Sequence, residues 1–312
     1  MNNPNGAARI HGEVLPNPEA AATNHEAAAS GCRRVAAPPL LSVNNLRTGY
    51  HRTEVVKGIS FTAERGDFVC VIGANGCGKT TALKGMLGIL PLFGGSVDVG
   101  GREFLSAGGH TATAKEFART FAYIPQIHGL PFPFLVSDVV LLGRTPHLRS
   151  SVSSPSDADK AAAYMALKTL GIESIAGSEY TALSGGQQQL VLIARALAQE
   201  PRILIMDEPT ASLDFGNQQL VLDRMLDLGR EGMAVIMVTH DPAHVLHCAN
   251  KVIVMDGGSV LREGTPEETI TAEILERIYG ARAAVTTARL DDGSEVRTVV
   301  PLSRRHTGAP PS

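Results

Sequence analysis

Tryptophan is absent from this 312-residue chain, and aromatic residues make up only 4% of it. Proteins that bind single-stranded nucleic acid stack the bases on aromatic side chains, so the composition disfavours that class. The formal net charge of −3 also lacks the positive excess that binds phosphate backbones. We therefore expect no nucleic-acid partner.

Cysteine is scarce as well, and its four positions (Cys32, Cys70, Cys77 and Cys248) do not have the spacing of zinc ligands. Scattered free thiols are typical of a reducing compartment. Long apolar runs are missing too. None approaches the roughly 18 residues that span a bilayer, and no signal-peptide segment opens the chain. The sequence predicts a soluble, cytoplasmic protein.

Residues 1–39 are rich in Ala, Asn, Pro and Gly and show no apolar periodicity. They cannot bury enough apolar surface to offset the entropy of ordering, so we expect a disordered N-terminal extension. Further along, alternating patterns predict antiparallel strands at 40–50 and 55–64, with another strand at 95–101. Continuous apolar stretches predict buried strands, and these lie at 66–73, 119–126, 202–209 and 233–241.

Helical patterns fill the stretches between these strands. Residues 127 to about 182 are predicted to be helical, with helices at 136–144, where Ser137 or Asp138 is the candidate cap, and at 157–172. Later helices are expected from about residue 216 and over 265–280, and hairpins around 256–258 and 291–293. Buried strands that alternate with helices predict an α/β fold, in which a mainly parallel sheet has antiparallel pieces at one edge.

The stretch GANGCGKTT (Gly73–Thr81) follows a predicted buried strand and opens a helix. It matches the phosphate-binding loop of P-loop NTPases in the strand–loop–helix context that this pattern requires. Its glycines let successive backbone N–H groups turn toward an anion at the helix N-terminus. Lys79 is predicted to reach the β- and γ-phosphates, and the Thr80 hydroxyl to bind Mg²⁺.

Two carboxylates follow a second buried strand, in ILIMDEP (Ile203–Pro209). Asp207 ends the strand, where burying a carboxylate is costly unless it binds a metal or hydrogen-bond donors. We predict that it is a direct or indirect Mg²⁺ ligand. Glu208 comes next and is predicted to orient and deprotonate water. The alternative, two ordinary surface carboxylates, is disfavoured by the apolar run before them and by Pro209.

Other strand ends are ambiguous when taken singly. His240 ends the strand in VTHD, at the edge where α/β proteins bind ligands, but a single histidine is more often structural. Gln126 ends another strand and alone would be an ordinary polar residue. Tyr50 could stack on adenine or simply be an exposed strand aromatic.

A second glycine-rich stretch, LSGGQQQL (Leu183–Leu190), could be a flexible linker. However, an uninterrupted apolar run, VLIARALA, follows it directly, and a flexible linker seldom leads into a helix. Its glycines suit a close backbone approach to phosphate. Taken alone, it leaves open why one domain needs two such loops.

Six motifs (GANGCGKTT, YIPQ, LSGGQ, ILIMDEP, SLD and VTH) occur in the order and spacing of an ABC transporter ATPase subunit, which residues 40–280 resemble. The resemblance implies a P-loop NTPase core with a helical subdomain inserted at about 127–182, followed by a C-terminal strand pair and tail at 281–312. It implies ATP hydrolysis with Mg²⁺, in which the catalytic residues are Glu208, His240 and Gln126. The implied Mg²⁺ ligands are Thr80, Gln126 and Asp207. The implied ATP-binding residues are Tyr50, Gly73, Ala74, Asn75, Gly76, Cys77, Gly78, Lys79, Thr80 and Thr81.

In proteins of this family two copies pair head to tail about a two-fold axis. The resemblance therefore implies a homodimer in which the signature of one copy caps the γ-phosphate held by the other. The implied signature residues are Leu183, Ser184, Gly185, Gly186 and Gln187. Asp214 matches the D-loop aspartate that acts across the dimer. Many relatives have arginine where this chain has Gln188, and we expect little effect from that difference.

Finer resemblances lie in GRTPH (Gly143–His147), SLDFGNQ (Ser212–Gln218) and RTVVP (Arg297–Pro301). They look like the ATPases of iron-siderophore, haem and vitamin B12 importers. Such a subunit works with two transmembrane permease subunits and a substrate-binding protein, at the cytoplasmic face of the bacterial inner membrane. Molybdate or tungstate importers share these stretches in part. A soluble ABC ATPase of translation or DNA repair is less well supported, because this chain has one nucleotide domain and no long coiled-coil insertion.

Overall fold

The computed structural model describes residues 37–126, 133–148, 153–211 and 213–302. The expected disorder of 1–36, the start of the helical stretch at 127–132, Ser212 and the tail beyond 302 lie outside the described residues. None of the described helices is long and apolar enough to cross a membrane.

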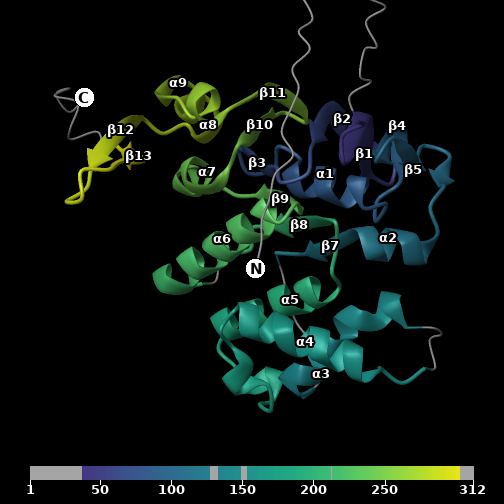
Figure 1. Cartoon of the computed structure of the whole chain (residues 1–312). Coiled ribbons are helices and arrows are strands. Elements are labelled where there is room, and N and C mark those ends of the chain that lie inside the picture. The colour runs from purple at the N-terminus through teal and green to yellow at the C-terminus, as the bar shows by residue number, and fades with distance from the viewer. Residues whose placement is uncertain (1–36, 127–132, 149–152, 212, 303–312) are drawn as a thin grey trace, which may run out of the picture. The chain divides into compact units, whose positions relative to one another are not determined.

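The central sheet has six strands, five of them parallel (Figure 1). Their order is β11 (Ser259–Gly264), β10 (Lys251–Asp256), β3 (Phe68–Gly73), β9 (Ala234–Val238), β8 (Ile203–Asp207) and β7 (Phe121–Ile124). Only β11 runs antiparallel, because the tight Gly257–Gly258 turn returns the chain beside β10. β3, β8 and β9 are buried at every position, which is why their sequences are continuous apolar runs rather than alternating ones.

A second sheet is antiparallel throughout. Its strands, in order, are β2 (Thr53–Ala63), β1 (Leu41–Tyr50), β4 (Leu92–Val99), β5 (Arg102–Ser106) and β6 (Gly109–His110). The predicted α/β fold, with a mainly parallel sheet and antiparallel elements beside it, is confirmed. β5, β6 and the helices at 114–120 and 242–248 were not predicted.

Two apolar cores lie on opposite faces of the parallel sheet. Alternate residues of β3 divide between them: Phe68 and Ile72 pack into the core with the later helices, while Val69 and Val71 pack against the first helix and the antiparallel sheet. Strand side chains alternate in direction, so one strand contributes to both cores. Each strand of the parallel sheet is thereby fixed from two sides.

Nine α-helices and three short 3₁₀ helices are described. They are α1 (Lys79–Met86), α2 (Ala114–Thr120), α3 (Val136–Leu141), α4 (Asp157–Thr169), α5 (Gly185–Ala198), α6 (Phe215–Arg230), α7 (Pro242–Cys248), α8 (Pro266–Thr269) and α9 (Ala272–Tyr279), with η1 (Leu142–His147), η2 (Glu173–Ile175) and η3 (Tyr180–Ala182). In Figure 1, α3, α4 and α5 lie together, and they are in mutual contact.

The predicted caps of the helix at 136–144 are wrong. α3 begins at Val136, its N-cap is Leu135, and neither Ser137 nor Asp138 caps it. The backbone N–H groups of Val136 and Ser137 instead donate to the carbonyls of Ser178 and Ala176, at 3.0 and 2.9 Å. A neighbouring loop therefore satisfies donors that a side-chain cap would otherwise take. From Leu142 the chain tightens into η1, which contains Pro146.

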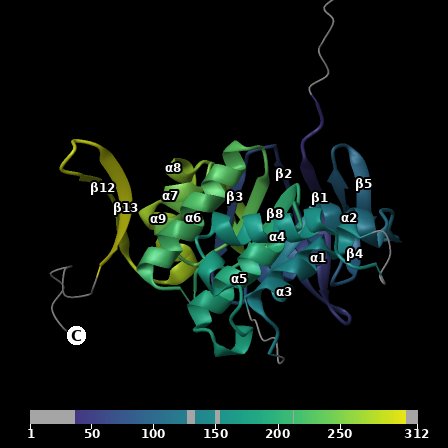
Figure 2. The ribbon, with the colours of Figure 1, turned by 60° about the horizontal axis from the view of Figure 1, so that its bottom comes forward.

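The predicted helix over 265–280 is two helices. α8 ends at Thr269, and Thr271 starts α9 by accepting a hydrogen bond from the Ile274 N–H. Beyond α9, β12 (Ala283–Arg289) and β13 (Glu295–Pro301) form the hairpin expected around 291–293. Figure 2 shows this ribbon beside α7 and α9, with which β13 and β12 respectively make contact.

The GRTPH stretch has a structural role in which Arg144 joins three elements. Its guanidinium, in a side chain only 9% exposed, lies 3.1 Å from Asp159 on α4 and donates to the Ala198 carbonyl at the end of α5. Asp159 also accepts hydrogen bonds from Ser156, the N-cap of α4. The Ser156 hydroxyl and backbone, followed by Arg144, lower the pKa of Asp159 to about 2.

We expect Asp159→Asn to lower the melting temperature by about 3–8 °C at pH 7, because it removes the buried one of two counter-charges of Arg144 and leaves the exposed carboxylate of Glu200 at 2.9 Å. The folded-state pKa of Asp159 lies below its unfolded value near 3.8, so the wild-type stabilisation is present above that value and is lost as the pH falls toward 2. Thermal unfolding between pH 7 and 3 should show a flatter profile for the variant. Asp157→Asn is the matched control, since that side chain on the same helix is 99% exposed. Equal pH profiles for wild type and Asp159→Asn would contradict the assignment.

Candidate active site

The phosphate-binding loop joins β3 to α1 as predicted. Gly76 has a φ of 78°, and a Cβ at this position would meet no atom within 4 Å, so the loop leaves open space above it. At Gly73 a Cβ would lie 2.2 Å from the Met255 carbonyl oxygen, which only glycine avoids. The loop is therefore packed against β10 on one side and open on the other, as a phosphate cradle requires.

Lys79 is 6% exposed and turns back onto this loop. Its ammonium group donates to the carbonyls of Gly73 and Ala74, at 2.8 and 3.0 Å. These two carbonyls partly compensate the buried charge of the ammonium group. A phosphate in the cradle would offer stronger, charge-assisted hydrogen bonds to the same ammonium group.

Asp207 is the end of β8 and is 1% exposed. Neither of its carboxylate oxygens has a hydrogen-bond partner among the described residues. Burial raises its pKa; the nearby Thr80 hydroxyl opposes this shift without completing a hydrogen bond, and Glu208 adds to it. A buried carboxylate that accepts no hydrogen bond from the described residues fits a cation site.

The residues around Asp207 fit Mg²⁺ better than a metal held by protein ligands alone. No group of three or more His, Cys, Asp and Glu side chains that could hold a metal occurs in the described part of the chain. Mg²⁺ is commonly bound by one or two protein oxygens together with substrate phosphates and waters. Asp207 and Thr80, beside a phosphate cradle, offer that donor set.

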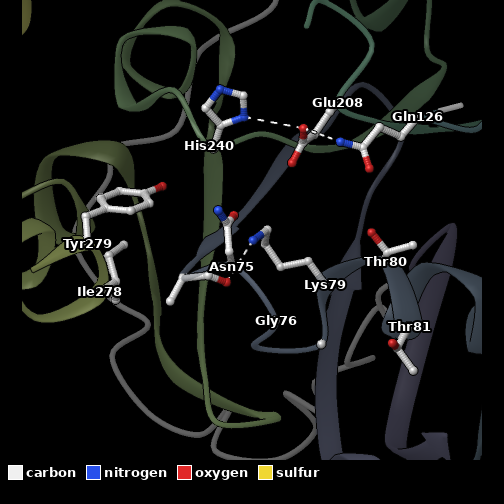
Figure 3. A pocket seen from close by; sticks show the side chains of 12 residues that line it. Asn75, Gly76, Lys79, Thr80, Thr81, Gln126, Glu208, His240, Ile278 and Tyr279 are labelled. Atoms are coloured by element: carbon white, nitrogen blue, oxygen red, sulfur yellow. Dashed lines mark hydrogen bonds and ion pairs between the residues drawn. The ribbon is translucent and has the colours of Figure 1, made fainter. Parts of the chain in front are cut away.

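Glu208 is held in a backbone conformation that few residues other than glycine adopt, with a φ of 51°. Its N–H donates to the Val238 carbonyl of β9 at 3.0 Å, which fixes this turn. The Gln126 side-chain amide donates to its carboxylate at 2.7 Å, and Nδ1 of His240 lies 3.5 Å from the same oxygen, Oε2 (Figure 3). Strained conformations cluster at active sites, and this one aims a carboxylate between two strand ends.

One cavity of about 800 Å³ brings half of the predicted site residues together. The predicted residues that line it are Ala74, Asn75, Gly76, Gly78, Lys79, Thr80, Thr81, Gln126, Glu208 and His240. Cys77 is 6% exposed, and burial raises the pKa of its thiol, which Lys79 partly opposes. Tyr50, at the end of β1, is 42% exposed and does not line this cavity.

Two lining residues were missed by the sequence reasoning, Ile278 and Tyr279 at the end of α9. No local pattern marks them, because a helix with an apolar face is the ordinary sign of core packing. They lie about 200 positions from the phosphate-binding loop, and only the tertiary structure brings the two together.

Comparison with known proteins identifies the family. The sequence profile described as ABC transporter matches residues 56–211. A Haemophilus influenzae protein, described as an uncharacterized ABC transporter ATP-binding protein, is 42% identical over 77% of this chain and 89% of its own length. The chain belongs to the ABC transporter family of ATP-binding proteins. It is an ATPase.

Other relatives carry names of particular importers. The iron(3+)-hydroxamate import ATP-binding protein FhuC of Bacillus subtilis is 34% identical over 79% of this chain and 90% of its own length. Proteins named for import of molybdate (Haemophilus influenzae), hemin (Nocardia farcinica) and cobalamin (Halobacterium salinarum) match at 33–36% identity. A solved structure of a candidate metal-chelate type ABC transporter, in an inward-facing conformation, has a TM-score of 0.74 at 32% identity. It covers 86% of this chain and all of its own.

The ABC signature stretch forms the N-terminus of α5 rather than a linker. Ser184 is the N-cap, its hydroxyl accepts from the Gln187 N–H, and the Gln187 side chain accepts in return from the Ser184 N–H. Gln188 donates to the Tyr180 carbonyl, and Gln189 is 2% exposed. Gln187 therefore caps the helix, Gln188 is hydrogen-bonded to the turn that precedes it, and Gln189 is buried in the core. None of the signature residues lines the cavity, and Ser184 and Gly185 are exposed.

The D-loop aspartate, Asp214, is exposed at the N-terminus of α6 and does not line the cavity either. It accepts hydrogen bonds from the backbone and side-chain N–H groups of Asn217, at 2.9 and 2.8 Å. These bonds lower its pKa. The Gln218 side-chain amide donates to the carbonyls of Thr210 and Leu213, which ties both residues to α6.

We expect Asp207→Asn to raise the melting temperature of the nucleotide-free protein by about 2–5 °C, because the buried, unpartnered carboxylate is replaced by a neutral group of the same shape. The same variant should lose on the order of 100-fold or more in Mg²⁺-dependent ATP hydrolysis. Thermal unfolding without nucleotide and a phosphate-release assay measure the two effects. Asp291→Asn, in the exposed turn of the β12–β13 ribbon, is the control. A variant that is less stable and fully active would refute the cation-site assignment.

Proposed function

We propose that this chain is the ATP-hydrolysing subunit of an importer, and that it works as a homodimer bound to two transmembrane permease subunits. The importer would take up a metal chelate delivered by a substrate-binding protein, and this subunit would lie at the cytoplasmic face of the bacterial inner membrane. One observation supports the dimer above all. The cavity holds the phosphate-binding loop, Glu208 and His240 but no signature residue, whereas the signature is an exposed helix N-terminus.

In this proposal each cavity is completed by the signature of the second copy. Ser184 and the first N–H groups of α5 would cap the γ-phosphate, because a helix N-terminus favours negative charge. Asp214 would lie at the same interface. A two-fold pairing makes both sites equivalent, since each copy gives one loop and receives the other. ATP would then hold two copies together, and its hydrolysis would release them.

Within one chain, some of these residues would bind the nucleotide and its Mg²⁺, and others would take part in hydrolysis. Tyr50 would stack on the adenine, and the loop from Gly73 to Thr81 would bind the phosphates. Lys79 would exchange its two carbonyl partners for phosphate oxygens. Thr80, Gln126 and Asp207 would hold Mg²⁺, which supplies neutralisation of charge on the phosphate oxygens.

Glu208 would accept the proton of the attacking water. Gln126 and His240 approach its carboxylate from the ends of β7 and β9, the two strands on either side of β8, which fixes its direction. His240, whose side chain is 57% exposed toward the cavity, would also contact the γ-phosphate. A base positioned in this way contributes a rate factor of roughly 10²–10⁴.

Glu208→Gln tests this assignment. The variant keeps the shape of the side chain but cannot take a proton, so we expect turnover to fall roughly 10²–10⁴-fold while ATP binding persists. Because bound ATP is not consumed, the variant should accumulate as an ATP-dependent dimer, measurable by light scattering after gel filtration. Glu231→Gln, at an exposed position after α6, is the control. Near-normal turnover in Glu208→Gln would show that another group is the base.

The substrate class is supported by the relatives named for iron-hydroxamate, hemin and cobalamin import and by the metal-chelate type structure. The relative named for molybdate import supports a second candidate, an oxyanion importer. The transported molecule does not touch this subunit, so the choice depends on the permease.

Transport into vesicles that contain this chain and its co-purifying permease distinguishes the candidates. We expect ATP-dependent uptake of an iron(III) hydroxamate, haem or cobalamin, abolished by Glu208→Gln. Uptake of molybdate alone would support the oxyanion importer. Failure of the chain to associate with any permease would contradict both and favour a soluble ABC ATPase.

A further inference from the structure

The hydroxyl of Tyr279 is buried beside the catalytic groups and has no hydrogen-bond partner among the described residues. Tyr279 lines the same cavity as Lys79, Glu208 and His240. Figure 3 shows the ring extending from α9 with its hydroxyl directed into the space beside Asn75 and His240. A buried hydroxyl without a partner costs folding free energy, and one that lines a cavity can gain its partner from a ligand bound there.

The position of this side chain is fixed by the packing of α9. Ile274, Leu275 and Ile278 anchor the inner face of the helix in the core, and Gly280, with a φ of 65°, ends it directly after Tyr279. The aromatic ring therefore comes from a helix that is held both by its apolar face and by its terminus.

α9 is also tied to the phosphate-binding loop through the β10–β11 hairpin. Arg277 forms an ion pair with Asp256 at 3.2 Å, at the end of β10. Two residues further on, the Gly258 N–H donates to the Cys77 carbonyl at 3.0 Å. One short path of contacts thus joins the helix bearing Tyr279 to the loop expected to bind phosphate.

The surroundings keep the Tyr279 hydroxyl protonated. Burial, together with the negative charge of Asp241 and Glu208, raises its pKa to about 12. A neutral phenol in the vicinity of two carboxylates can give a hydrogen bond to an anion, and it does not compete with Glu208 as a base. An anion in the cavity is the missing acceptor for such a donor.

We propose that Tyr279 is a further catalytic residue, whose hydroxyl donates a hydrogen bond to an oxygen of the terminal phosphate when the site closes. The proposal rests on the proposed binding of ATP in this cavity. The proton stays on the tyrosine throughout. As charge shifts on the phosphoryl oxygens during transfer, a donor already in place stabilises the transition state more than the ground state.

Tyr279→Phe removes this donor and nothing else. We expect kcat to fall about 10- to 100-fold with KM for ATP changed less than about twofold, as for an interaction made mainly in the transition state. Inhibition by orthovanadate with ADP, which mimics the phosphoryl group in transfer, should weaken by a similar factor. Binding of ADP alone should stay unchanged, because ADP lacks the terminal phosphate.

Stability separates this role from a structural one. The nucleotide-free variant should melt at the same temperature as the wild type or higher, because an unpartnered hydroxyl has been removed. A variant with a lower melting temperature would show that the hydroxyl stabilises the fold, and this would overturn the proposal. So would a variant whose kcat and orthovanadate inhibition remain within about twofold of the wild type.

Tyr180→Phe is the matched control. Its hydroxyl is also buried without a partner in the described part of the chain, but it lies outside the cavity. We expect no change in kcat or in orthovanadate inhibition. Glu208→Gln in the same assay separates the two claims. If turnover falls in Glu208→Gln but is normal in Tyr279→Phe, only the role of Tyr279 is wrong. If turnover falls in Tyr279→Phe but is normal in Glu208→Gln, only the assignment of Glu208 as general base is wrong.

Discussion

The parallel pairing of β3, β9, β8 and β7 is the constraint on which the site depends. Parallel strands all end at the same edge, so four chain segments that are far apart in sequence deliver their next residues to one place. β3 leads into the phosphate-binding loop, β8 ends at Asp207, and His240 and Gln126 follow β9 and β7 by two residues. Two apolar cores hold this sheet from both faces, so the strand ends are positioned before any ligand arrives.

The same edge of the sheet holds buried charged groups and a strained residue that the rest of the protein does not fully compensate. Among the described residues, Asp207 accepts no hydrogen bond and the ammonium group of Lys79 donates to two loop carbonyls, while Glu208 occupies a left-handed backbone conformation. Each feature costs stability in the folded chain. A nucleotide with its cation would compensate two of them, with negative charge for Lys79 and positive charge for Asp207. Binding energy and fold stability are therefore coupled at this edge.

Position at the end of a buried strand singled out Asp207 and Glu208, whereas Gln126 and His240 were ambiguous until the resemblance to ABC transporter ATPases assigned them roles. The structure brings Gln126 and His240 to the carboxylate of Glu208. Patterns failed where a distant segment supplies the partner. The donors of α3 are satisfied by carbonyls near residue 177, which made the expected Ser137 or Asp138 cap unnecessary, and Tyr279 enters the cavity from a helix with ordinary core periodicity. Such tertiary contacts leave no signal in a local window.

In LSGGQQQL, local hydrogen bonds fix the N-terminus of α5 in a position where a second chain could contact it. The reciprocal hydrogen bonds of Ser184 and Gln187 define where α5 begins, and Gln188 and the buried Gln189 hold the turn before it. What remains free is the outward end of the helix, where Ser184 and Gly185 are exposed. A helix N-terminus held so firmly presents its N–H groups in a fixed direction. A second chain could use such an end without reordering it, which makes a site shared between two copies physically reasonable.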